Sequence, residues 1–581
     1  MPAEGRGAIK AACRAIDGLA RVRTGSHLAQ LGAYEREQFM DRLESSVPGA
    51  AAVELLKASI LLVAGADEQT DDLISRSRQS APARPDPRLN VIESTWWPSK
   101  KRVDVVVIGS GAGGAMVART LARSGMDVVV VEEGRRWTVE EFRSRAPIER
   151  FAELYRGAGA TIALGLPPVI LPIGRGVGGT TLVNSGTCFR TPNKIMQRWR
   201  DYFGLGWADP DTFDTYLDDV EETLQVGPVP MDVMGRNGKT ILAGAEKLGW
   251  AHGPLLRNAP GCGGCCQCAI GCPRNAKFGV HLNALPQACD AGARIVSHAR
   301  VVKILQDEGT VQGVLARRPD GSTFAIEAAD VVVACGATET PPLLRRSGLG
   351  SHPRLGHNLA LHPAVGCGGR FEEPIVGWEG VLQSAMVSEF HESHGMMIEA
   401  TATPPGMGSM TLPGTGKTLL SEMAGMDHVA SVGAMIGDSP SGRVLGAKRS
   451  VITYQLAKQD GRRLIEAMQK MGEILFAAGA YEVLLVAPGA PAARSVEELR
   501  DTLNGLSYRK LHVTAFHPTG TVAAGADPQF APVTPAGELR GARGAWVADA
   551  CILPSCPEVN PQVSIMAAAQ VVADEVVAAR G

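Results

Sequence analysis

The 581-residue chain lacks any uncharged apolar run of the roughly 18 residues needed to cross the hydrocarbon core of a bilayer. We therefore expect no transmembrane segment. Residues 1–18 carry acidic and basic side chains where a secretory signal would have an apolar stretch. The sequence thus predicts a cytoplasmic location, and leaves open a peripheral attachment to a membrane.

The chain also lacks an excess of charge of either sign. Its 58 Lys and Arg residues against 60 Asp and Glu residues give a net charge of −2. A nucleic-acid-binding protein usually presents a strongly basic face, so we expect no nucleic-acid partner. In a reducing compartment the 12 cysteines are expected to be free, and a cluster of them would indicate metal or redox chemistry.

Glycine is abundant, with 68 residues, and one glycine-rich turn has the pattern of a dinucleotide site. The β-branched run at 105–108 leads directly into Gly-x-Gly-x-x-Gly, and a predicted helix and second strand follow, the strand ending at Glu132. Gly109 allows the tight turn, Gly111 lets the backbone approach a pyrophosphate, and Gly114 lets the helix pack on the strand. Glu132 is placed to accept a hydrogen bond from a ribose hydroxyl.

The length predicts several domains, because one hydrophobic core does not extend over so long a chain. We expect an α/β protein with a Rossmann-type dinucleotide-binding domain, a largely antiparallel β-sheet plus helix substrate domain, and an N-terminal helical extension. The boundaries predicted from composition are 1–80 for the helical extension, 81–100 for a proline-containing linker, 101–370 for the dinucleotide-binding domain, 371–505 for the substrate domain and 506–581 for a C-terminal return to the first domain.

Several further motifs follow in a fixed order along the chain. They are GVGGTTLVN at 176–184, CGATETP at 335–341, GHNLALHP at 356–363, HP at 517–518, VAD at 547–549 and VNP at 559–561. Together with the glycine-rich turn they resemble the glucose–methanol–choline (GMC) family of FAD oxidoreductases. The resemblance covers roughly 100–370 and 505–581, and implies that the dinucleotide is FAD.

The resemblance also implies further contacts to FAD. Asp549 is expected at the ribityl chain or pyrophosphate, and Asn184 and Gly179 beside the isoalloxazine ring. Gly178, Val302 and Pro561 are the other cofactor-binding residues that it implies.

Oxidation of an alcohol by hydride removal needs a base to take the hydroxyl proton. His517 is the candidate, since imidazole titrates near neutrality, and the alternative is a hydrogen-bonded structural histidine. Asn560 directly precedes Pro561 and an apolar run, which is typical of a helix N-cap. The resemblance adds a second role for Asn560, which is to hold the substrate hydroxyl beside the histidine. The helix over 561–579 would point its positive end at the flavin.

A run of cysteines offers a second redox feature. Cys262, Cys265, Cys268 and Cys272, followed by proline, fit the C-x₂-C-x₂-C-x₃-C-P spacing of bacterial ferredoxins and predict a possible iron–sulfur cluster. A structural or disulfide-capable loop is the main alternative. Zinc is disfavoured, because zinc ribbons need two cysteine pairs separated by a longer loop.

These observations predict FAD-dependent oxidation of an alcohol CH–OH group to a carbonyl. Oxygen or an electron carrier would accept the electrons. The small-molecule substrate is expected to be a lipophilic or long-chain alcohol. A methionine-rich stretch over 396–426 would suit an adaptable apolar pocket, and the alternative is ordinary packing in the core. The alternatives are a sugar or polyol dehydrogenase that passes electrons through an iron–sulfur cluster, and an FAD-dependent lyase on the same fold. The N-terminal helices could dock a partner.

Overall fold

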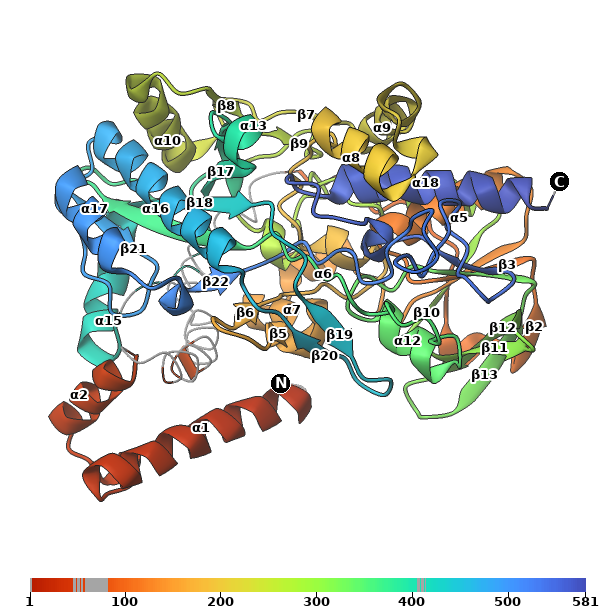
Figure 1. Cartoon of the computed structure of the whole chain (residues 1–581), viewed down its shortest axis with the longest axis horizontal. Coiled ribbons are helices and arrows are strands. Elements are labelled where there is room, and N and C mark those ends of the chain that lie inside the picture. Colours follow the sequence, from red (N-terminus) through yellow and green to blue (C-terminus); the bar gives the residue numbers. More distant parts are fainter. Residues whose placement is uncertain are drawn as a thin grey trace.

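The computed structural model describes residues 3–44, 82–404 and 414–580, and between them the single positions 49, 53, 56, 57, 408 and 412. Most of residues 45–80, the second part of the predicted helical extension 1–80, lies outside the described residues. Met407 and Met410 of the methionine-rich stretch also lie outside them. Figure 1 shows an α/β molecule, with the six-stranded sheet and its helices on the right of the view and a larger sheet with its helices on the left.

The valine-rich runs form the centre of a parallel sheet of six strands. Every residue of β3 (Val105–Ile108) and β4 (Val128–Val131) is buried, as expected of strands covered on both faces. The strand order is β1 (Val91–Glu93), β10 (Arg294–Ser297), β4, β3, β14 (Asp330–Val333) and β23 (Ala545–Val547). Because all pairs are parallel, the carboxyl ends of the strands lie at one edge, where dinucleotides bind in such sheets.

Three helices cover this sheet and tie the C-terminus to it. The predicted helix after the glycine turn is α5 (Ala112–Arg123), and it packs against α11 (Ala284–Asp290) and α18 (Gln562–Ala578). α18 is buried along most of its length, because it lies between α5 and α9 (Pro210–Leu224). The last helix of the chain therefore packs on the first helix of the dinucleotide motif (Figure 1).

The segment 81–100, expected to be a linker, is built into the sheets at its C-terminal end. Its residues 91–93 form β1, the edge strand of the parallel sheet, and Lys100 begins β2 (Lys100–Arg102). β2 closes a second, four-stranded sheet, which has the order β11 (Arg300–Asp307), β12 (Thr310–Arg317), β13 (Thr323–Glu327) and β2.

A largely antiparallel sheet of nine strands forms the other half. Its order is β5 (Ile162–Ala163), β6 (Val169–Ile170), β22 (Val513–Thr514), β15 (Ala364–Arg370), β18 (Val429–Ile436), β17 (Met396–Thr401), β16 (Gln383–Val387) and β8 (His252–Pro254), with β21 (Glu482–Leu485) paired to β15. Helices α10 (Gly235–Leu248) and α16 (Lys458–Ala478) pack on it, and α17 (Val496–Gly505) packs on α16. The sheet takes strands from both sides of the predicted 371–505 range.

Short elements connect these layers. They are the helices α6 (Val139–Ser144), α7 (Pro147–Leu154), α8 (Asn193–Phe203), α12 (Thr340–Arg346), α13 (His391–His394) and α15 (Gly416–Ala424), and the strand pairs β7 (Gly227–Pro228) with β9 (Leu256–Arg257) and β19 (Arg443–Leu445) with β20 (Val451–Thr453).

The N-terminal helices α1 (Ala3–Thr24) and α2 (Ala33–Glu44) lie at the lower left of Figure 1. The backbone N–H of Lys417 donates to Glu37 at 3.0 Å, and the hydroxyl of Thr415 donates to Asp41 at 3.1 Å. α2 thus contacts the start of α15, beside the larger sheet. Among the described residues, no helix is long and apolar enough to cross a membrane.

Candidate active site

A cavity of about 790 Å³ lies between the carboxyl edge of the parallel sheet and the nine-stranded sheet. Its wall combines the ends of β3, β4 and β14 with residues of β15, β17 and β18. The predicted site residues that line it are Gly109, Gly111, Glu132, Gly179, Asn184, His517, Asp549, Asn560 and Pro561. Those that do not are Gly114, Gly178, Val302, Cys262, Cys265, Cys268 and Cys272.

The glycine-rich turn leaves open space at the position where a pyrophosphate would lie. Gly109 has a φ of +100°, and a Cβ there would collide with the carbonyl oxygen of Ala334. A Cβ on Gly111, in contrast, would meet only the Cα of Gly179, at 3.9 Å. The turn leads into α5, whose first N–H groups have no partners within the helix and favour an anion. These residues fit the pyrophosphate of FAD.

Glu132 is buried at the end of β4 and holds this turn in place. Its Oε2 accepts hydrogen bonds from the backbone N–H of Ser110 at 3.1 Å and from the Ser110 hydroxyl at 2.7 Å. Its Oε1 accepts from the backbone N–H of Gly134 at 2.8 Å. Burial raises the pKa of the Glu132 carboxyl, while these hydrogen bonds oppose the rise. The carboxyl therefore already has protein partners on both oxygens.

Asp549 joins the ends of two neighbouring strands in a similar way. Its Oδ2 accepts from the backbone N–H of Gly336 at 2.8 Å and from the hydroxyl of Thr340 at 2.9 Å. Its Oδ1 accepts from the backbone N–H of Cys551 at 2.7 Å. Burial raises the pKa of the Asp549 carboxyl. The aspartate lies at the carboxyl edge of the sheet, next to the glycine turn.

The three predicted cofactor residues outside the lining lie close behind it. A Cβ on Gly114 would collide with the carbonyl oxygen of Gly109, so this glycine allows α5 to pack on the turn. Gly178 has a φ of +113° and donates its backbone N–H to the hydroxyl of Ser110 at 3.0 Å. The carbonyl of Val302 accepts from Arg346 at 2.8 Å, and the preceding residue, Val301, lines the cavity.

At the opposite side of the cavity, two histidines face each other. Nδ1 of His517 lies 3.0 Å from Nδ1 of His362, and their rings are inclined by 37°. Burial lowers the pKa of His517 to about 4. Burial, reinforced by His517, lowers that of His362 well below its usual value. Both imidazoles are therefore neutral at pH 7, and one Nδ1–H donates to the other Nδ1.

A buried aspartate fixes the backbone of His362. His362 has a φ of +55°, which is unusual for a residue other than glycine. The two oxygens of Asp438 accept from the backbone N–H groups of Leu361 at 3.0 Å and His362 at 2.9 Å, and from the hydroxyl of Tyr454 at 2.8 Å. Burial raises the pKa of Asp438 to about 6. This network holds the imidazole of His362 against His517.

Asn560 does not cap the following helix as the sequence suggested. Pro561 occupies the N-cap position of α18, and no side chain caps the helix. Pro561 has a φ of −85° and a ψ of 4°, and α18 begins at the next residue, Gln562. Asn560 therefore lies one residue before the N-cap position. The side chain of Asn560 instead lies next to Glu399 of β17, and its Oδ1 is buried without a partner. The start of α18 still faces the cavity, through Pro561 and Gln562.

Asn184, in the cavity wall, contacts the buried Lys277 and the start of α18. The amide of Asn184 donates to Oε1 of Gln562, and its Oδ1 lies 3.3 Å from Nζ of Lys277. Lys277 also donates to the carbonyl of Thr181. Burial lowers the pKa of Lys277 to about 8. The start of α18 is thus joined to the loop that contains Asn184.

The cysteine run does not have the arrangement of a metal centre. Within the described part of the chain, no group of three or more His, Cys, Asp or Glu residues is placed to hold a metal ion. All 12 cysteines are free. The guanidinium of Arg257 donates to Sγ of Cys268 at 3.2 Å and to Sγ of Cys262 at 3.8 Å. A buried cation thus takes the position between two of the four sulfurs, and the structure does not support the predicted iron–sulfur cluster.

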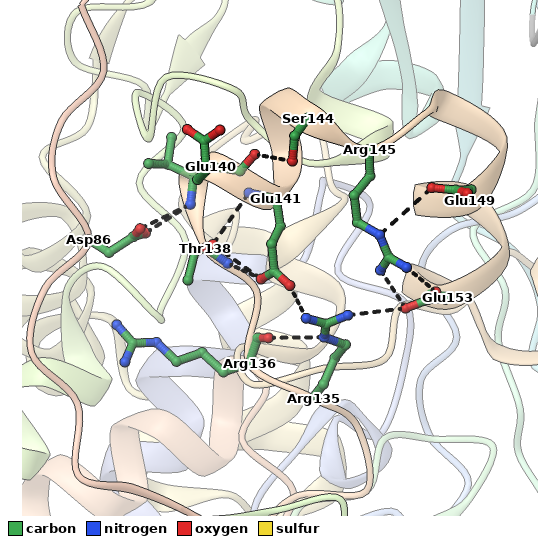
Figure 2. A network of polar contacts seen from close by, with 11 residues as sticks. Asp86, Arg135, Arg136, Thr138, Glu140, Glu141, Ser144, Arg145, Glu149 and Glu153 are labelled. Carbon is green, nitrogen blue, oxygen red and sulfur yellow. Dashed lines mark hydrogen bonds and ion pairs between the residues drawn. The ribbon is translucent and has the colours of Figure 1, made fainter.

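A network of polar contacts anchors the segment that follows Glu132 in the chain (Figure 2). The hydroxyl of Thr138 accepts from the backbone N–H of Glu141 at 3.3 Å, and the Glu141 carboxylate accepts from the backbone N–H of Thr138 at 2.9 Å. Arg135 donates to Glu141, and Arg145 donates to Glu153 at 2.8 Å. α6 and α7 are fixed in this way, and Tyr155, immediately after α7, lines the cavity.

Sequence reasoning missed four residues of this site, namely His362, Gln383, Glu399 and Asp438. A weak signal existed for two of them. His362 precedes a proline just as His517 does, and Glu399 is the one charged residue in strand β17. Asp438 and Gln383 come from segments without a distinctive pattern. Their roles depend on tertiary contacts that one sequence does not reveal.

Comparison with protein-family models identifies the chain. Models described as GMC oxidoreductase match residues 151–364 and 439–569, and a model described as FAD binding domain matches residues 102–166. An uncharacterized GMC-type oxidoreductase of Mycobacterium tuberculosis is 59% identical over 580 residues, which are 100% of this chain and 92% of the relative.

A more distant relative and a solved structure extend the comparison. A long-chain-alcohol oxidase of Arabidopsis thaliana is 29% identical over 508 residues, covering 81% of this chain and 68% of the relative. The crystal structure of pyridoxine 4-oxidase from Mesorbium loti superposes with a TM-score of 0.65 at 19% identity, covering 82% of this chain and 99% of that chain. The structural match agrees with the α/β fold described above.

Proposed function

The chain belongs to the GMC oxidoreductase family of FAD-binding enzymes, and on that basis we propose that it oxidises an alcohol CH–OH group to a carbonyl. His517 is the base that takes the hydroxyl proton, and Asn560 positions the hydroxyl. The observation that carries the proposal is that these two residues line the same cavity as the glycine-rich turn at 109–114.

The geometry gives His517 the properties of a base. Burial holds its pKa near 4, so the ring is neutral at pH 7 and has a free nitrogen lone pair. If Nδ1–H of His517 donates to His362, then Nε2 carries that lone pair and accepts the substrate proton. FAD, when bound, supplies the acceptor for the hydride that leaves the substrate carbon. Asp438 keeps His362 in place and thereby orients the base.

The substrate we propose is a lipophilic primary or secondary alcohol. The side chains of Ile170, Leu382, Met426 and Met435 line the cavity on the side of the nine-stranded sheet. Apolar and thioether side chains bind a hydrocarbon substrate by excluding water from it. The relative from Arabidopsis thaliana carries the name long-chain-alcohol oxidase, which supports the same class.

Replacement of His517 by alanine tests the role of the base. We expect kcat at pH 7 to fall by at least about a hundredfold, the contribution typical of general-base catalysis, while FAD remains bound. His252, on β8 and outside the cavity lining, supplies the control H252A, which should retain the wild-type rate. A near-wild-type rate in H517A would refute the assignment.

The wild-type pH profile gives a second test of the base. Protonation of His517 should lower kcat/KM only below about pH 5.

Anaerobic mixing with substrate separates oxidation from a lyase reaction on the same fold. Oxidation must bleach the flavin absorbance in proportion to the alcohol consumed, because electrons pass to FAD. A lyase would convert its substrate with the flavin spectrum unchanged.

A comparison of substrates tests the substrate class. It measures kcat/KM for a series of primary alcohols of increasing chain length, and for hexoses and polyols. Higher kcat/KM for the sugars would overturn the lipophilic assignment.

A further inference from the structure

A buried glutamic acid lies in the cavity wall opposite the cofactor turn. Glu399, on β17, is only 1% exposed and sits between Ile398 and Ala400 in the strand. No charged side chain contributes to its electrostatic environment; burial is the cause that raises its pKa, to about 8, and the neighbouring Asn560 side chain opposes the rise. Such an isolated carboxyl keeps its proton at pH 7.

One oxygen of this carboxyl has a fixed partner. The hydroxyl of Thr187 donates to Oε1 of Gln383 at 3.1 Å, which sets the orientation of the Gln383 amide. Nε2 of Gln383 then donates to Oε2 of Glu399 at 2.7 Å. Oε2 therefore acts as an acceptor, and the acidic proton belongs on Oε1.

Two buried polar atoms next to this carboxyl have no partner. Oε1 of Glu399 and Oδ1 of Asn560 are both buried without a hydrogen bond, although the two side chains are within hydrogen-bonding reach. A buried polar atom without a hydrogen-bond partner destabilises the folded protein. An amide can present either end by turning about its terminal bond, and a protonated carboxyl is a donor.

We propose that Glu399 is a positioning residue: as a neutral acid, it donates Oε1–H to Oδ1 of Asn560 and so turns the Asn560 amide NH₂ toward the substrate oxygen. In this arrangement Oε1 of Glu399 and Oδ1 of Asn560 are hydrogen-bonded to each other, so neither atom is left without a partner. It leaves the NH₂ group as a donor on the cavity side, where it holds the alcohol oxygen while His517 takes the proton. The inference rests on the proposed oxidation and assigns how the hydroxyl is oriented.

Loss of the proton from Glu399 would reverse the arrangement. A carboxylate only accepts, so it would draw the NH₂ of Asn560 to itself, and the substrate oxygen would face Oδ1, which cannot donate. Activity should then fall as pH rises through the pKa of the carboxyl. The groups that face Glu399 from the neighbouring elements are uncharged: Gln383 on β16, Gly433 opposite on β18, and Asn560 before α18.

The test compares the ratio of kcat/KM at pH 7 and pH 9.5 in the wild type and in E399Q. With a pKa near 8, less than about a tenth of the wild-type enzyme keeps its active form at pH 9.5, so the ratio should be about tenfold or more. The glutamine side chain does not titrate, and its NH₂ can donate to Oδ1 of Asn560, so its ratio should be near one. If E399Q has the same ratio of kcat/KM between pH 7 and pH 9.5 as the wild type, the proposal is overturned.

Lys277 is the other group near the cavity with a pKa of about 8, and K277M is therefore the matched variant. The alkaline loss should persist in K277M. If the alkaline loss of activity disappears in K277M and persists in E399Q, Lys277 and not Glu399 is responsible.

A second comparison tests the donor itself. E399M, whose side chain has no hydrogen-bond donor, should have a lower kcat/KM at pH 7 than the wild type, with normal FAD content. E399Q should retain most of the wild-type kcat/KM. Equal rates in E399M and the wild type would contradict the positioning role.

A measurement without substrate separates this inference from the proposed function. Infrared difference spectra between the wild-type holoenzyme and E399Q should show a protonated carboxyl band at pH 7 that is lost at pH 9.5. Absence of the band at pH 7 refutes the neutral acid whatever the enzyme oxidises. If the band is present but no alcohol is oxidised, the proposed function has failed while the protonation state of Glu399 stands.

Discussion

Two of the buried carboxyls that line the cavity, Glu132 at the cofactor end and Glu399 at the substrate end, differ in their hydrogen-bond partners. Glu132 accepts three hydrogen bonds from Ser110 and Gly134, shared between both of its oxygens. Glu399 has one oxygen bound by Gln383 and one without a partner. Both oxygens of Glu132 therefore have hydrogen-bond partners within the protein before any ligand binds. Glu399, in contrast, keeps one oxygen available for a new partner.

The largest expected effect comes from filling the open space at the cofactor end. G111V would place a branched side chain where the backbone faces the expected pyrophosphate, since a Cβ at Gly111 meets nothing closer than 3.9 Å. We expect the variant to fold and to lose FAD affinity by about a hundredfold or more, because the side chain occupies the ligand's volume. FAD content after purification and fluorescence titration measure the loss.

Gly253 supplies a control for this change, because a Cβ at this position would meet nothing within 4 Å, and the residue lies on β8, outside the cavity lining. G253V should keep its full FAD content. If G111V also binds FAD normally, the dinucleotide does not approach the turn in the way described.

The next effect is expected at the substrate end. N560A should lower kcat/KM by about thirtyfold, since a hydrogen bond to the reacting oxygen is typically worth about 2 kcal/mol, while FAD content stays normal. The double variant N560A/E399Q sharpens the comparison. If Glu399 acts through Asn560, the E399Q substitution should no longer change the pH profile in the N560A background. Additive effects would show that the two side chains act separately.

The cofactor end could be predicted from the sequence because its signals are local. The run at 105–108, the glycine turn and Glu132 lie within about 30 residues, the length of a βαβ unit, and their spacing alone defines the unit. The strand β3 has the predicted bounds, and β4 ends at Val131, directly before Glu132. Membership of the GMC family and the α/β fold were also predicted correctly from ordered motifs.

The substrate end could be predicted only in part, because its contacts join distant segments. His517 and Asn560 are visible as motif residues, but Asn560 was expected to cap α18, and its contact with Glu399 crosses 161 positions of the chain. The cysteine spacing was misleading for a related reason. Arg257, which lies outside the spaced motif, places its guanidinium against two of the sulfurs, and spacing alone does not reveal it.

The glutamate-to-glutamine substitution should have a smaller effect than the preceding variants, and its effect should differ between the two carboxyls. In E132Q an amide NH₂ would face a donor, either Ser110 or Gly134, so we expect the free energy of unfolding to fall by about 1–3 kcal/mol. In E399Q the amide can donate to Asn560 and accept from Gln383, so the change should be within about 0.5 kcal/mol. Urea midpoints of the two holoenzymes measure the difference, and equal shifts would contradict the contrast in pairing.

The smallest expected effect concerns two helix N-caps, one in each half of the molecule. Thr138 and Glu141 cap α6 reciprocally, so T138A leaves the bond from the Thr138 backbone N–H to the Glu141 carboxylate in place. Ser495 accepts from the backbone N–H of Glu498 at the start of α17 without a reciprocal bond, because the Glu498 carboxylate accepts from Arg494 instead. We expect S495A to destabilise its helix by about 1 kcal/mol and T138A by about half of that. Hydrogen exchange of the amides in α6 and α17 measures both. A larger loss in T138A would show that the paired contacts near the cofactor end depend on one another, since removal of one hydroxyl would then weaken the network shown in Figure 2.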